Sequence, residues 1–150
     1  GFKEAEKQTD PSKQHRVPSD KGGQYTLSNN YAAQAEEVIV ELKKSMGRDY
    51  QNFTTSKIRN ILAMVNAIYN DVLNEQNEKL NSELQSRIEY LKVRLVYECG
   101  REPRIVKPFV DKAKLLSLLE NIGDDRKRFL DFARYMEALV AYHRFYGGRD

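Results

Sequence analysis

Apolar residues recur at intervals of three and four through five stretches of this 150-residue chain, and no stretch alternates convincingly between apolar and polar positions. Intervals of three and four place apolar side chains on one face of an α-helix, whereas alternation is typical of a half-buried strand. The pattern therefore predicts five helices and no strand. Their expected ranges are 29–46, 54–75, 82–100, 107–123 and 125–147.

Residues that cap or break helices mark the ends of these ranges. Glycines follow the first, third and fourth helices, at Gly47, Gly100 and Gly123. The third helix begins with Ser82 and Gln85 in the spacing of a capping box. The other helices begin with hydroxyl residues, a first-turn proline or an aspartate pair, namely Thr54, Thr55 and Ser56; Pro108; and Asp124 and Asp125.

Long helices with short connections are typical of a compact helical bundle. We therefore expect one all-α domain at 29–150. Residues 1–28 hold almost no large apolar group and are expected to form a flexible tail, part of which could come from a vector. The apolar surface of the fourth helix is wide for a small bundle. Either the core is large or this surface pairs with another chain, and the interpretation favours the large core.

Charge is abundant but nearly balanced. The chain has 25 Lys and Arg against 22 Asp and Glu, a net charge of +3, with a mean hydropathy of −0.72. Bulk charge alone would therefore hold a nucleic acid poorly. The balance differs along the chain, with 14 basic and 10 acidic residues in 87–150 but 6 and 8 in 29–86. An acidic partner should prefer the C-terminal half.

The metal-ligating residue types are few. The single cysteine, Cys99, excludes an internal disulfide and a cysteine-based zinc cluster, and His15 and His143 lack a ligand spacing. We expect no metal and no cofactor, an inert buried thiol at Cys99 and a packed imidazole at His143. With no long apolar run and no secretory signal, the sequence favours a cytoplasmic protein without membrane contact.

No pattern of a known catalytic site is present, because glycine-rich phosphate loops and the GxSxG motif are both missing. Only Glu137, flanked by apolar residues, is a candidate general acid. Arg134 lies one turn away, so the interpretation favours a structural Arg134–Glu137 ion pair. We expect no catalytic residue and no enzymatic activity.

Arginine and tyrosine alternate along the third predicted helix. The five residues are spaced by three and four positions, which places them on one side of a helix: Arg87, Tyr90, Arg94, Tyr97 and Arg101. We call this set the Arg–Tyr stripe. Guanidinium pairs with phosphate and tyrosine stacks on bases, so the stripe fits an RNA surface. The alternative is that the arginines only extend along the edge of the core and the tyrosines are half buried, and this alternative is favoured if the stripe stands alone.

Two further basic clusters occur. Lys57 and Arg59 lie near the start of the second helix, where backbone N–H groups and hydroxyls could hold a phosphate. The alternative is an ordinary capped helix with solvated side chains. On the fifth helix, Lys127, Arg134 and Arg144 lie beside a series of tyrosines. Dispersed clusters with a modest net charge favour a subunit that contacts a nucleic acid as part of an assembly.

Three sequence blocks carry a family resemblance: FTTSKIRNIL at 53–62, RIEYLKVRLVYECGRE at 87–102 and ARYMEALVAYHRFYGGRD at 133–150. They resemble the small subunit, of the Csm family, of type III-A CRISPR–Cas effector complexes. The resemblance covers about residues 29–150 and is most specific at the C-terminal block. The tail before residue 29 lies outside it.

The resemblance implies a five-helix, non-catalytic protein, several copies of which stack along the guide–target RNA duplex beside the other effector subunits. Implied partners are target RNA, guide RNA, those subunits and copies of itself. The basic residues in the matching blocks, together with Arg94 from the stripe, are the expected RNA-binding set: Lys57, Arg59, Arg87, Lys92, Arg94, Arg101, Arg134 and Arg144. The alternative is a purely structural helical adaptor without direct RNA contact.

Overall fold

A computed structural model describes residue 27 and residues 29–150 of the protein, so most of the predicted tail at 1–28 lies outside the described residues. The described part contains six α-helices and no strand, which confirms the all-α bundle. The helices are α2 (Tyr31–Met46), α3 (Arg59–Leu73), α4 (Ser82–Arg101), α5 (Val106–Ala113), α6 (Leu115–Ile122) and α7 (Arg126–Phe145). Two short 3₁₀ helices, η2 (Gly47–Asn52) and η3 (Thr55–Ile58), connect α2 to α3.

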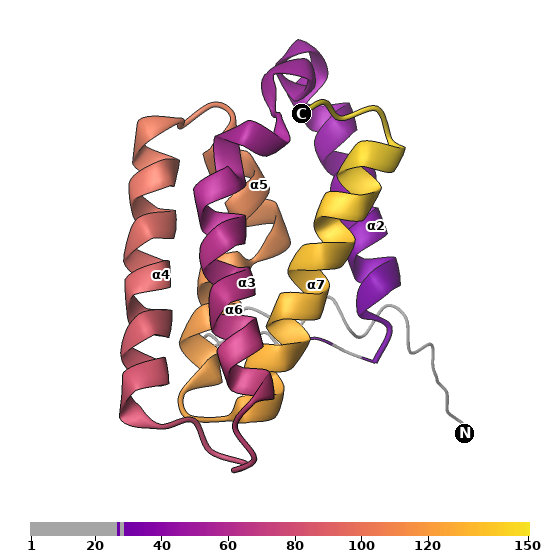
Figure 1. The fold of residues 1–150 in the computed structure, drawn as a ribbon. Coiled ribbons are helices and arrows are strands. Elements are labelled where there is room, and N and C mark those ends of the chain that lie inside the picture. The colour runs from indigo at the N-terminus through magenta and orange to yellow at the C-terminus, as the bar shows by residue number, and fades with distance from the viewer. Residues whose placement is uncertain (1–26, 28) are drawn as a thin grey trace, which may run out of the picture.

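The long helices run roughly side by side (Figure 1). α7 packs against α2, α3 and α6, while α4 packs on α3 and on the α5–α6 pair and forms one outer edge of the bundle. The C-terminal ends of α2, α4 and α7 lie at the same end, together with η2, η3 and the C-terminal residues. Side chains from separate segments of the chain therefore meet at this end.

Apolar faces from all six helices form one core, which includes Leu91, Phe109, Leu115, Phe129 and Tyr135. The wide apolar surface of the fourth predicted helix is largely inside it, because Leu115, Leu118 and Leu119 are buried. The preference for a large core is thereby confirmed. Among the described residues, no helix has the length and apolar character needed to cross a bilayer.

The fourth predicted helix is two helices, because the chain bends at Lys114. That residue adopts the left-handed conformation, with φ 61° and ψ 35°, which ends α5 and begins α6. Such a conformation costs a residue other than glycine roughly 1 kcal/mol. The bend lets the apolar residues of both segments face the core. The buried Tyr135 hydroxyl donates to the Ala113 carbonyl oxygen at 3.1 Å and fixes the bend.

The N-cap residue is the predicted one at α7 and lies one residue before the predicted one at α4. Asp125 caps α7 by accepting a hydrogen bond from the Arg128 N–H at 3.1 Å, as expected. The cap of α4 is Asn81 rather than Ser82, since the Asn81 Oδ1 accepts from the Leu84 N–H at 2.8 Å. The side-chain Nε2 of Gln85 donates to the Leu80 carbonyl oxygen instead of closing a capping box.

Candidate nucleic-acid interface

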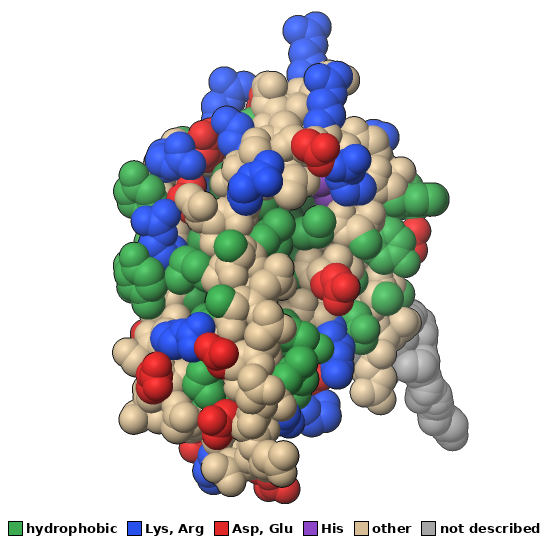
Figure 2. All heavy atoms as spheres, in the orientation of Figure 1, with side chains coloured by type: hydrophobic (Ala, Val, Ile, Leu, Met, Phe, Trp, Pro, Cys, Tyr) green, Lys and Arg blue, Asp and Glu red, His purple; other side chains and the backbone are tan. Residues whose placement is uncertain are grey.

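Basic side chains gather at one end of the bundle. Segments 43–60, 98–107 and 144–150 meet there and contain ten Lys and Arg but only four Asp and Glu. Contacts join the segments, since Arg104 pairs with Asp49 at 3.2 Å and the Thr55 N–H donates to the Arg149 carbonyl oxygen at 3.0 Å. Figure 2 shows Lys and Arg crowding this end. We call these three segments the basic end.

The opposite end of the bundle has the reverse balance. Segments 70–83 and 120–131 hold four basic and eight acidic residues. Backbone hydrogen bonds join these segments too, because the Leu80 N–H donates to the Asp124 carbonyl oxygen at 2.7 Å. The small net charge of the chain thus conceals a strong separation of charge along the bundle. A polyanion approaching the molecule is directed toward the basic end.

Arg48 and Arg59 are two exposed cations of the basic end that carry no internal ion pair. Among the described residues, neither side chain has a carboxylate partner or a hydrogen bond. Arg48 lies on η2 and Arg59 begins α3. Arg59 was expected from the sequence, whereas Arg48, Arg104 and Arg149 were not, because only the folded chain brings them to the same end.

The Arg–Tyr stripe lies on the outer face of α4, but its two residue types behave differently. The tyrosines are open to solvent, with Tyr90 57 % and Tyr97 55 % exposed, and Val93 and Val96 beside them are exposed as well. We call these four residues the α4 outer strip. The arginines are engaged by carboxylates of the same chain, the first of them by Asp71. This pairing favours the alternative interpretation, in which the arginines extend along the edge of the core rather than bind RNA.

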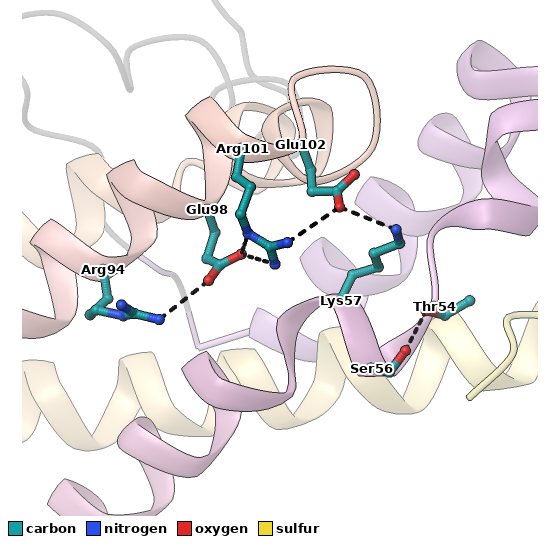
Figure 3. A network of polar contacts seen from close by, with 7 residues as sticks. All are labelled: Thr54, Ser56, Lys57, Arg94, Glu98, Arg101 and Glu102. Atoms are coloured by element: carbon teal, nitrogen blue, oxygen red, sulfur yellow. Dashed lines mark hydrogen bonds and ion pairs between the residues drawn. The ribbon is translucent and has the colours of Figure 1, made fainter.

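Glu98, which was not predicted from the sequence, pairs with the other two stripe arginines. Its side chain is only 3 % exposed. Arg101 donates to the Glu98 Oε1 from Nε at 3.1 Å and from Nη2 at 2.7 Å, and Arg94 donates to Oε2 at 3.4 Å (Figure 3). These hydrogen bonds raise the pKa of Arg101. The Arg94 guanidinium also lies 5.3 Å from the centre of the Tyr97 ring. Glu98 follows Arg94 by four residues and precedes Arg101 by three, and this helical spacing was the signal in the sequence that could have revealed both contacts.

The start of the second predicted helix does not offer a free phosphate site. The Thr55 and Ser56 N–H groups donate to the backbone oxygens of Arg149 and Asp150 at 3.0 and 2.9 Å. No hydroxyl caps the turn, and the Thr54 and Ser56 hydroxyls bond to each other at 2.9 Å. The phosphate interpretation of these backbone groups was wrong, because the C-terminal residues of the chain already occupy them.

The other residues of the expected RNA-binding set are dispersed. Lys92 pairs with Glu120 at 3.3 Å and Glu89 at 3.6 Å, halfway along α4. Arg134 lies on the middle of α7, and Arg144 pairs with Asp150 at the basic end. The structure thus brings four of the eight together at the basic end and leaves the other four along α4 and α7. The four at the basic end are Lys57, Arg59, Arg101 and Arg144.

A comparison with known protein families decides the identity of this bundle. Residues 32–149 match the family described as Csm2 of type III-A. The chain belongs to the Csm2 family. It is 41 % identical over 121 residues to the CRISPR system Cms protein Csm2 of Streptococcus thermophilus, covering 81 % of this chain and 94 % of that protein.

Two further Csm2 relatives, both named CRISPR system Cms protein Csm2, agree with this assignment. The protein of Mycobacterium tuberculosis is 39 % identical over 124 residues, which cover 83 % of this chain and 97 % of the relative. The protein of Enterococcus italicus is 37 % identical over 123 residues, with 78 % and 87 % covered. The family resemblance of the three sequence blocks is confirmed.

Glu137, the candidate general acid, is exposed on α7 of this Csm2-family chain. It lines an open groove of about 480 Å³ between α3 and α7, together with Arg134 and Tyr69. Arg134 pairs with Asp131 at 3.9 Å, and no Arg134–Glu137 ion pair forms, so that expectation was wrong. An exposed carboxylate lacks the apolar surroundings that a general acid needs. In the described part of the chain, no group of three His, Cys, Asp or Glu could hold a metal ion.

Cys99 and His143 are buried, as expected for both. Burial raises the pKa of the Cys99 thiol, which disfavours a reactive thiolate. The His143 Nε2 lies 2.7 Å from the Phe53 carbonyl oxygen, and the ring packs against the Tyr50 and Phe53 rings. Burial lowers the pKa of His143, so the imidazole is neutral and donates to Phe53 from Nε2.

Burial of a neutral His143 makes stability depend on pH. The unfolded chain takes up a proton at this residue below about pH 6.5, while the folded chain resists it. The stabilisation is therefore present above pH 6.5 and is lost as the pH falls below it. We expect the free energy of unfolding to drop by about 1 kcal/mol between pH 7.5 and 5.5, measured by urea denaturation. A His143→Gln variant should lack this drop; an equal drop in the variant would contradict the assignment.

Proposed function

We propose that this protein is a non-catalytic small subunit of a type III-A CRISPR–Cas interference complex in the cytoplasm, and that it contacts target RNA in the assembled complex. Membership of the Csm2 family supports the place in the complex. The RNA contact is supported by the exposed, unpaired Arg48 and Arg59 within the basic end. Guanidinium groups held on helix ends are well suited to the phosphate oxygens of an RNA backbone.

The size of this contact explains why the protein would act in several copies. Three phosphate contacts on a single strand give a salt slope of about −2, which is weak binding at physiological salt. Several copies stacked along the guide–target duplex would raise the effective concentration of each contact. The α4 outer strip supports contacts with other copies or effector subunits, because exposed valine and tyrosine side by side are typical of protein interfaces.

A purely structural adaptor is the second candidate. The pairing of Arg87, Arg94 and Arg101 with carboxylates of the chain itself favours it, because paired arginines are less available to RNA. The α4 outer strip would then be the main functional surface. Under this alternative, mutations at the basic end would leave RNA binding by the assembled complex normal.

Reversing the unpaired charges of the basic end tests the RNA contact. In the reconstituted complex, Arg48→Glu with Arg59→Glu should weaken target RNA binding about tenfold and make the salt slope shallower by about one or more. Both should be measured by fluorescence anisotropy at several salt concentrations. Arg101 is unsuitable for this test, since the buried Glu98 engages it and its loss would also disturb the fold.

The control is an equal change of charge at the other end of the bundle. Lys79→Glu with Lys127→Glu alters two cations that are 77 % and 80 % exposed, far from the basic end. This variant should bind RNA almost as the unmodified complex does. Equal RNA affinity and salt slope in the Arg48/Arg59 variant and this control would reject the proposed RNA surface and favour the adaptor.

A further inference from the structure

Two cations from different elements converge on one carboxylate at the basic end. Lys57, on η3, places its Nζ 3.2 Å from the Glu102 Oε2. Arg101, in the last turn of α4, places its Nη1 3.8 Å from the same oxygen (Figure 3). The two residues are 44 positions apart in the sequence, so only the fold brings them together. An ammonium and a guanidinium that converge on a carboxylate oxygen can bind a phosphate oxygen in the same way.

The carboxylate at this position lies just beyond the end of a helix. Glu102 follows the last residue of α4, and its backbone has left the helical conformation, with φ −127° and ψ 67°. Its side chain is 21 % exposed, so it can turn toward water. Partly exposed ion pairs of this kind contribute only about 1 kcal/mol or less. Arg101, in contrast, stays anchored by its two hydrogen bonds to the buried Glu98.

We propose that Lys57 and Arg101 form a phosphate site that Glu102 occupies in the unbound protein, and that an RNA phosphodiester displaces this carboxylate. The inference rests on the proposed function and names a site within it. Because Glu98 keeps Arg101 in place, one side of the site is preorganised, and only Glu102 has to move. Displacing an internal anion lowers the affinity of a single copy for RNA. The site therefore favours binding by assembled copies over binding by the free subunit.

Neutralising Glu102 tests this site. Glu102→Gln keeps the size of the side chain but removes the competing charge. The isolated 150-residue chain should then bind a fluorescent 30-nucleotide RNA about fivefold more tightly at low salt, with a salt slope steeper by up to about one. The steeper slope is expected because no carboxylate has to be returned to solvent and recover its own counterion when the phosphate binds.

Asp49→Asn is the matched control, since it removes one carboxylate from Arg104 at the same end and gives the same change in net charge. Both variants are then combined with Lys57→Met. The gain in RNA affinity caused by Glu102→Gln should largely disappear when Lys57 is replaced. Any change in RNA affinity caused by Asp49→Asn should persist in the Lys57→Met background. A Glu102→Gln effect that survives the loss of Lys57, or that is absent at low salt, overturns the phosphate site.

The outcome also separates this inference from the proposed function. If Arg48→Glu with Arg59→Glu weakens RNA binding by the complex while Glu102→Gln changes nothing, the RNA surface stands and the phosphate site is rejected. If the Arg48/Arg59 variant also binds normally, the proposed RNA contact itself fails.

Discussion

Replacing Gly148 by alanine should lower the free energy of unfolding by about 2 kcal/mol, the largest effect we expect from a single methyl group in this protein. A Cβ atom at this position would lie 2.3 Å from two atoms of the His143 ring, well inside van der Waals contact. At a size of 150 residues, this loss corresponds to a fall in melting temperature of roughly 4–8 °C.

The clash cannot be relieved by a small shift of the imidazole. The His143 ring is 3 % exposed, is bonded to the Phe53 carbonyl oxygen and packs against two aromatic rings. The C-terminal residues would have to move instead. They would lose the hydrogen bond from the Gly148 N–H to the His143 carbonyl oxygen at 2.8 Å and those from Thr55 and Ser56. Three lost hydrogen bonds at about 0.5–1.5 kcal/mol each amount to roughly 1.5–4.5 kcal/mol, a range that includes the expected loss.

Gly100→Ala is the matched control. Gly100 lies in the last turns of α4, and a Cβ atom there would meet nothing within 4 Å. Alanine at this position should raise stability slightly, by up to about 1 kcal/mol, because it is the better helix former. Thermal unfolding followed by circular dichroism measures both variants. If Gly148→Ala melts at or above the temperature of the unmodified protein, the packing of His143 against the C-terminal residues is wrong.

The fold could be predicted from the sequence because each helix carries a clear apolar face. The faces with Leu91 and Leu95 on α4 and with Phe129 and Leu139 on α7 follow the helical period and are buried as expected. The bend at Lys114 could not be predicted from the sequence. Lysine rarely adopts a left-handed conformation, so no local signal marks the bend, and it arises from packing between α5, α6 and α7.

The candidate site could be predicted only in part, for a different reason. Periodicity correctly placed Tyr90 and Tyr97 on the outer face of α4, and spacing alone would have shown that Glu98 lies within reach of two arginines. The basic end, in contrast, is assembled from three segments far apart in the chain. Arg48, Arg104 and Arg149 share no motif, and their proximity depends on which helix ends meet.

Removing both arginines that hold Glu98 should be the most destabilising change at the candidate interface. In an Arg94→Met/Arg101→Met variant, the Glu98 carboxylate would remain buried without a cation. Removing the partners of a buried charge costs about 3–5 kcal/mol, whereas an exposed ion pair contributes less than about 1 kcal/mol. We therefore expect a loss of about 3 kcal/mol in the free energy of unfolding, measured by urea denaturation at pH 7.5.

The triple variant that adds Glu98→Leu should recover most of this loss, because an apolar side chain can replace a buried ion pair at little cost. Lys127→Met, which removes an exposed partner of Asp131, serves as the control and should change stability by less than about 0.5 kcal/mol. A double variant as stable as this control would mean that Glu98 is hydrated rather than held by the two arginines. The arginines would then be as available to RNA as the stripe first indicated, whereas the expected loss would mean that Arg94 and Arg101 stabilise the fold.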